Sequence, residues 1–170
     1  MTTSTDPGKR ELEWMAPAAP HQPFVLSAHG ERLGWLLFED EDGRRAQGEL
    51  DGRRWTFERA GLAHPHVIIR AEDVVGEFSG HVVSFATGAR YRWSHTSFWG
   101  DTWCFHREGD KTSVCVTQQS GPIQTGGKVS LCCGGGPQPE TPILVLLAWY
   151  LRVLDYGKLI AEANARLPVF

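Results

Sequence analysis

Nine consecutive apolar residues near the end of the chain, 143 to 151 (ILVLLAWYL), constrain the fold more than any other feature. Thr141 and Pro142 before them suit the start of a helix, and Gly157 after them is a residue type that ends helices. A helix that is apolar on every side lies either in lipid or inside protein. The run is about half as long as a bilayer requires, which favours burial inside protein. Because only a closed sheet surrounds a helix in a chain this short, we expect a helix over about residues 140–156 inside a barrel.

The chain between Phe24 and Cys133 breaks into short runs that are typical of strands. They are rich in Val, Ile, Phe, Trp and Tyr, and turn signals separate them. No helical pattern intervenes, which predicts a meandering antiparallel barrel or sandwich. The eleven runs are FVLSAH, RLGWLLFE, RRAQGEL, RRWTFER, HVIIRA, DVVGEF, HVVSFA, ARYRWSH, DTWCFHR, KTSVCVTQ and KVSLCC.

Two Asp-Gly pairs, at 42–43 and 51–52, predict two-residue hairpin turns. The first register turns Trp35 toward the buried, aromatic face of the sheet. The second places Glu49 opposite Arg54, a pair of opposite charge. Both turns therefore predict one buried face and one charged face for this three-strand meander.

A third hairpin, at Gly109-Asp110, sets Cys104 directly across from Cys115. Two cysteines in this position are close enough for a disulfide. The N-terminus lacks the apolar core of a signal peptide, so we expect a cytoplasmic protein, either free or peripheral at the membrane, with reduced thiols. The cysteines show no zinc-ligand spacing, and we expect no metal.

The two ends of the chain differ from its centre. Residues 1–23 are polar and then proline-rich, which predicts a flexible N-terminal arm; alternatively, Trp14 docks into a groove of its own or another chain. Residues 157–170 predict a short amphipathic segment that caps the barrel mouth or packs outside. The barrel domain itself is expected over residues 24–156.

Composition excludes several classes of protein. With 17 Lys and Arg against 20 Asp and Glu, the formal charge is −3, which argues against nucleic-acid binding. No apolar run reaches the length of a transmembrane helix. Thirteen of the 17 basic residues are Arg, which favours bidentate contacts to phosphate or carboxylate. The excess of Arg also suggests a bacterial source.

Three stretches give the chain a resemblance to a known group: DGRRWTFER, GARYRWSHTSFWGDTWCFHREGD and PILVLLAWYL. It resembles the tubby C-terminal-like superfamily, and its Gly-x-x-Tyr-x-Trp unit (Gly88, Tyr91, Trp93) is most similar to the LURP-one-related or phospholipid scramblase branch. The resemblance implies a mainly β fold, an antiparallel barrel of about 11–12 strands that encloses a hydrophobic C-terminal α-helix. No acidic loop matches the calcium site proposed for scramblases, so lipid scrambling is not implied.

Tubby-like barrels bind phosphoinositide head groups through basic surface residues, and the comparable positions here are Arg90 and Arg92. Arg53 and Arg54, at a turn, are further candidates. The leading hypothesis is therefore a non-enzymatic binding module that docks to anionic phospholipid head groups, or to a protein partner, through the outer barrel surface. In a bacterial cell a common anionic phospholipid is a better candidate than a phosphoinositide.

Catalytic motifs fail on their spacing, so we expect no enzyme activity and no cofactor. His64-Pro65-His66 lacks the following Glu of a cupin metal site, and GPIQTGGKVS departs from a phosphate-binding loop at two positions. The alternative is a cupin- or lipocalin-type barrel that binds a small ligand. It requires 143–151 to lie outside and leaves an empty lumen lined by tryptophans. A third alternative is a structural or oligomerisation domain that uses Trp14 and the N-terminal arm.

Overall fold

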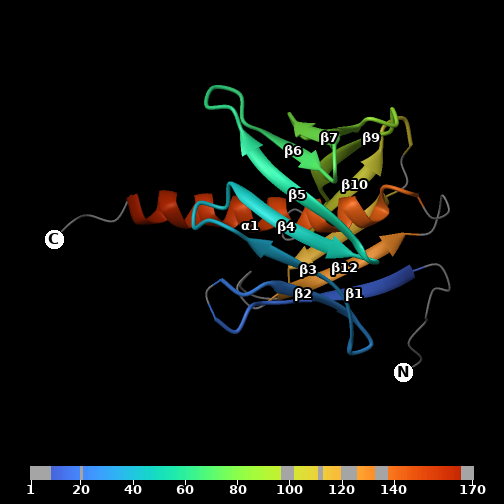
Figure 1. Ribbon diagram of the computed structural model, residues 1–170, viewed down its shortest axis with the longest axis horizontal. Helices are drawn as coiled ribbons and strands as arrows, with labels where there is room; N and C mark the ends of the chain where they lie inside the picture. Colours follow the sequence, from blue (N-terminus) through green and yellow to red (C-terminus); the bar gives the residue numbers. More distant parts are fainter. Residues whose placement is uncertain are drawn as a thin grey trace.

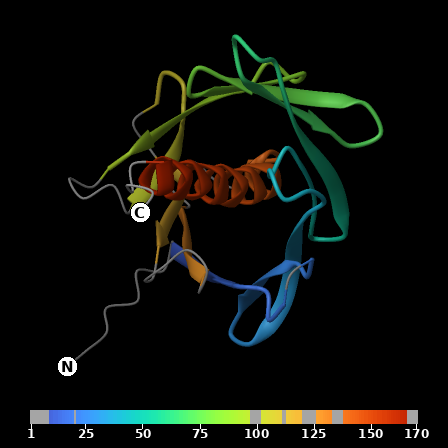
Figure 2. The same cartoon turned by 90° about the vertical axis from the view of Figure 1, so that its left-hand side faces the viewer.

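The computed structural model describes residues 9–19, 21–96, 102–110, 113–119, 126–132 and 138–165, with the side chains of the C-terminal helix described as far as residue 155. Twelve antiparallel strands form a closed barrel around this helix (Figures 1 and 2). Neighbouring strands are consecutive in the chain, and β1 closes the barrel by pairing with both β12 and β2. The elements are β1 (Lys9–Met15), β2 (Phe24–Ala28), β3 (Glu31–Phe38), β4 (Arg45–Leu50), β5 (Arg53–Ala60), β6 (His66–Arg70), β7 (Val74–Ser79), β8 (Val82–Phe85), β9 (Arg90–His95), β10 (Thr102–Arg107), β11 (Ser113–Gln119), β12 (Gly126–Cys132) and α1 (Thr141–Ala165).

The apolar helix fills the barrel, as the sequence predicts. Every side chain from Leu144 to Tyr150 is fully buried, and Figure 2 shows α1 enclosed by the ring of strands. Gly48 on β4 gives α1 room to approach, since a Cβ there would lie 3.1 Å from Leu146 Cδ1. The Tyr150 hydroxyl donates to the Gly43 carbonyl at 3.0 Å, which satisfies its polar end. An empty, tryptophan-lined lumen is therefore wrong for this chain, and with it the cupin- or lipocalin-type arrangement.

The helix continues past Gly157, where the sequence predicts its end. Its backbone is helical to Ala165, and Figure 1 shows its C-terminal turns extending beyond the strands. A glycine inside a helix costs only about 1 kcal/mol relative to alanine, too little to stop a helix held by many buried turns. The predicted separate segment at 157–170 is thus part of α1 as far as Ala165, and residues 166–170 lie outside the described residues.

The predicted flexible arm contains the strand that closes the barrel. In β1, apolar and polar residues alternate: Leu12 and Trp14 are 4% and 1% exposed, whereas Glu11 and Glu13 are exposed. The Trp14 ring stacks on Trp149 of α1 at 5.7 Å between centroids. Composition alone misses this strand, because it has only two buried apolar side chains. The signal lies in their spacing, which alternates with exposed polar residues. Residues 1–8 lie outside the described residues.

The hairpin registers are partly as predicted. The turn at Asp51-Gly52 pairs Glu49 with Arg54, which confirms the second register. The first register is wrong by one residue: Trp35 pairs with Glu49 on the outer face, and its neighbour Leu36 is fully buried. The connection is longer than two residues, because its ladder ends at a Glu39–Arg45 hydrogen bond of 2.9 Å. A shift of one residue exchanges the two faces of a strand.

The thiols of Cys104 and Cys115 do not lie directly across from each other, so this prediction is also wrong. A β-bulge at Phe105/His106 shifts the register, so that Cys104 pairs with Val116 and Cys115 pairs with Phe105. The two cysteines therefore belong to opposite faces of the sheet. Both thiols are free. Burial raises the pKa of the Cys115 thiol far above its usual value, and the nearby Cys132 and Cys104 raise it further.

Candidate functional site at one end of the barrel

Arg90 and Arg92 lie on the outer face of β9, about half exposed, and share one carboxylate. Glu108 Oε2 lies 3.1 Å from Arg90, and Glu108 Oε1 lies 3.6 Å from Arg92. The face that the resemblance implies for lipid binding therefore already carries a carboxylate, that of Glu108, which offsets the positive charge of the two arginines. Sequence reasoning missed this acid because Glu108 follows the next strand, beyond the β9–β10 connection.

Arg53 and Arg54 begin β5, which three strands separate from β9 around the barrel. The Arg54 Nε donates to Glu49 Oε2 at 2.6 Å, and its guanidinium lies 5.8 Å from the ring centroid of Trp35. Arg54 is thus engaged on the outer face. Arg53 is exposed and forms no ion pair among the described residues. The structure therefore places the two arginine pairs apart, and of these four residues only Arg53 has no ion pair with the described part of the chain.

One of the two ends of the barrel is the end where α1 enters, and we name it the Thr141 end. At this end the odd-numbered strands begin and the even-numbered strands finish. Four exposed arginines at this end have no ion pair within the described ranges: Arg10, Arg32, Arg53 and Arg107. The ion-paired Arg90 lies at the same end, as do the exposed acids Glu31, Asp51, Glu72, Asp73, Glu108 and Asp110. Positive and negative side chains are therefore mixed at this end, and selectivity must come from local geometry.

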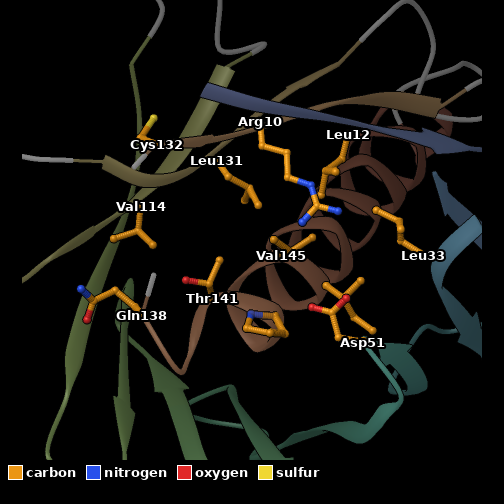
Figure 3. A pocket seen from close by; sticks show the side chains of 12 residues that line it. Arg10, Leu12, Leu33, Asp51, Val114, Leu131, Cys132, Gln138, Thr141 and Val145 are labelled. Carbon is orange, nitrogen blue, oxygen red and sulfur yellow. The ribbon is translucent and has the colours of Figure 1, made fainter. Parts of the chain in front are cut away.

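A cavity of about 440 Å³, the end pocket, opens at the Thr141 end beside the first turn of α1 (Figure 3). Its walls are mainly apolar, and its polar groups come from Arg10, Asp51, Gln138 and Thr141, with Cys132 at one edge. The apolar lining comes chiefly from Leu12, Leu33, Leu50, Val114, Leu131 and Val145.

Arg10 occupies an inward position of β1 at the barrel mouth. It shares the strand face of Leu12 and Trp14 and pairs with Leu131 of β12. In Figure 3 its guanidinium points into the end pocket, above Val145 and toward the side where Asp51 lies. Sequence reasoning missed Arg10 because it assigned this segment to the arm; the alternation in KRELEWM is the signal that identifies its face.

Glu140 fixes the start of α1 on the opposite side from the end pocket. Its carboxylate is 6% exposed and accepts hydrogen bonds from the Tyr91 hydroxyl at 3.1 Å and the Thr87 hydroxyl at 3.0 Å. Its backbone carbonyl accepts from Leu144 N at 3.0 Å. Burial, with a further contribution from Glu140, raises the pKa of Tyr91 to about 12. This network holds the helix start, and hence one wall of the end pocket, in place.

The hydrogen bond between Tyr91 and Glu140 makes the free energy of unfolding depend on pH in the alkaline range. Because the pKa of Tyr91 is raised from 10.0 to about 12, its neutral phenol is favoured by folding, and this contribution is intact below pH 10 and lost as the pH rises through about 12. Tyr91→Phe is expected to cost about 1–2 kcal/mol at neutral pH, through the lost hydrogen bond. It should also make the free energy of unfolding fall less steeply between pH 10 and 12. Urea unfolding at stepped pH measures both, and an unchanged pH slope in the variant would contradict this assignment.

Candidate catalytic groups are not assembled into a site within the described ranges. Cys104 Sγ lies 3.7 Å from His106 Nδ1 and 3.8 Å from Ser94 Oγ, but Cys104 is only 2% exposed. His66 Nδ1 lies 3.1 Å from the His64 carbonyl, and no set of three metal-ligating side chains comes together in the described part of the chain. Residues 121–125, the first half of GPIQTGGKVS, lie outside the described residues.

Comparison of the chain with protein-family models, curated proteins and solved structures finds no match. Over the residues that the structure describes, no helix has both the length and the hydropathy needed to cross a membrane.

Proposed function

We propose that this protein is a non-enzymatic binding module of tubby-like architecture that docks to anionic phospholipid head groups through the Thr141 end of its barrel. The twelve strands around an apolar helix agree with the architecture that the resemblance implies. Because α1 fills the interior, a ligand must bind on the outer surface or at a barrel end.

The observation that carries the proposal is the position of Arg10. An exposed guanidinium without an ion pair among the described residues lies at the mouth of an apolar cavity. A guanidinium binds phosphate oxygens in a bidentate manner, and the cavity offers an apolar surface beside it. An anionic lipid has both features, a charged head group next to a hydrocarbon region.

The Arg90–Arg92 face is a poorer candidate for the same role. Docking an anion there must compete with Glu108, which already contacts both guanidinium groups. This difference between Arg10 and the Arg90–Arg92 pair makes the two surfaces separable by mutation.

Liposome flotation tests the proposal. Wild-type protein is expected to bind vesicles containing phosphatidylglycerol, not vesicles of phosphatidylcholine alone, and to bind more weakly as salt increases. Arg10→Glu is expected to weaken binding at least about tenfold, since it removes a basic residue that contributes about 1 kcal/mol near an anionic surface and adds a negative charge that the surface repels. Arg90→Glu/Arg92→Glu is the comparison variant and should retain more of the binding than Arg10→Glu, because Glu108 already contacts both of these arginines. Absence of binding to anionic vesicles at low salt would overturn the proposal.

A protein partner is the second candidate, and one surface feature favours it. Met15, Val25 and Trp35 pair in a row across β1, β2 and β3 on the outer face, and Met15 is 47% exposed. Exposed apolar rows of this kind mark interaction surfaces. Trp35→Ser, which removes the apolar side chain without adding charge, is therefore included in the flotation series. Unchanged vesicle binding by this variant would support docking through the Thr141 end. Lost binding would indicate docking through the row of Met15, Val25 and Trp35.

A further inference from the structure

We infer that the end pocket is a binding site for a single acyl chain that carries one anionic head group, such as a fatty acid or a lysophospholipid. The inference rests on the proposed function, because it names the ligand of the same barrel end. It adds that a chain enters the protein, whereas head-group docking alone needs only the rim.

Irregularities of the sheet coincide with the pocket. The described ladders contain three register shifts, and each leaves one residue without a partner: Leu33 in β3, Val75 in β7 and Val114 in β11. All three belong to the Thr141 end, and Leu33 and Val114 both line the end pocket. A β-bulge re-aims a side chain, and bulges are common beside functional sites. Here two of them turn apolar residues of opposite walls toward one cavity.

The chemistry of the walls selects a hydrocarbon. Leu12, Leu131 and Val145 provide no hydrogen-bonding group, so a polar ligand body buried against them would lose its contacts with water without compensation. A volume of about 440 Å³ lies in the range of small-molecule sites and suits one chain. An acyl chain therefore fits the interior of the pocket, with its polar end left at the mouth.

The charged groups at the mouth of the end pocket determine which head group can bind there. Arg10 offers a guanidinium with no ion pair among the described residues, and Thr141 and Gln138 contribute further polar atoms to the lining of the pocket. Asp51, on the turn between β4 and β5, brings a negative charge to the same mouth. One anionic group beside Arg10 is therefore favoured over a highly charged head group, which Asp51 would repel.

A chain-length series tests this inference on the full-length protein. Binding of monomeric carboxylates from hexanoate to dodecanoate is measured by calorimetry below their critical micelle concentrations. Affinity is expected to rise about fourfold for each added methylene until the pocket is full, and then to level off. A parallel measurement with lysophosphatidylglycerol distinguishes free fatty acid from lysophospholipid as the preferred source of the chain.

Two variants fill the pocket without changing charge. Leu131→Trp is expected to abolish chain binding, and Val114→Phe provides a second filling substitution in case the first destabilises the fold. Ser130→Trp, on the adjacent position and the opposite face of β12, is the matched control and should bind as the wild type does.

The outcomes separate this inference from the proposed function. Chain-length-dependent binding that the filling variants abolish supports the inference. Flotation on anionic vesicles without any chain-length dependence would overturn the inference alone. Chain binding without flotation would support the pocket and overturn membrane docking, and the absence of both would overturn both.

Discussion

The substitution Leu147→Asp is expected to abolish folding, because it places a carboxyl group at the centre of the filled barrel, where the side chain is fully buried. Keeping that carboxyl neutral at pH 7 costs about 4 kcal/mol relative to its ordinary pKa. Losing the buried leucine costs a further 2–5 kcal/mol, roughly, and the unpartnered polar group adds about 1–3 kcal/mol. Together these costs are comparable to the whole stability of a domain, about 5–15 kcal/mol.

Circular dichroism and thermal unfolding measure this effect. Leu62→Asp is the control, since Leu62 is 99% exposed and the same substitution there should leave the melting temperature nearly unchanged. A cooperative melt of the Leu147→Asp protein near the wild-type temperature would show that α1 does not occupy the barrel.

Trp14→Ala is expected to destabilise the protein by about 3–5 kcal/mol, the range for truncating a buried tryptophan. Trp14 is 1% exposed and stacks on Trp149, so its removal leaves a cavity between β1 and α1. It also weakens the strand that closes the barrel between β12 and β2.

The matched control is Trp35→Ala, which removes the same side chain from the outer face. Trp35 contacts the Arg54 guanidinium there, a cation–π interaction of about 0.5–1 kcal/mol, so a loss of about 1 kcal/mol is expected. Chemical denaturation of both variants measures the difference. Equal losses for the two tryptophans would contradict the assignment of β1 to the barrel wall.

The architecture could be predicted from the sequence because it depends on strong, long-range patterns. An apolar run without a polar stripe leaves a helix few places to lie, and the eleven runs predicted as strands correspond to β2–β12. The strand β1 was missed because its proline-rich surroundings resemble a tail. Its alternation of Leu12 and Trp14 with Glu11 and Glu13 is a weaker signal over only a few residues.

The two errors in register have different physical causes. An Asp-Gly pair predicts a two-residue turn, but the Asp42-Gly43 connection is longer, and the Asp40 carboxylate accepts the Arg44 N–H at 2.6 Å inside it. The bulge that displaces Cys104 from Cys115 depends on packing that no local pattern encodes.

The candidate site was the least predictable part. Arg53 was identified from its place at a turn, whereas Arg10 acquires its position only when β1 pairs with β12. Glu140 likewise becomes a buried anchor only because Tyr91 and Thr87, about fifty residues earlier in the chain, meet it. Sites of this kind are assembled by barrel closure, and closure is a tertiary event.

The most direct test of the central claim compares the flotation of two charge-reversal proteins on the same anionic vesicles, Arg10→Glu and Arg90→Glu/Arg92→Glu. The position of Arg10 at the end pocket predicts that the single substitution abolishes most of the binding and that the double substitution, on the face where Glu108 already neutralises the arginines, retains it. The reverse pattern, with binding kept by Arg10→Glu and lost in the double variant, would contradict a functional site at Arg10 and the end pocket.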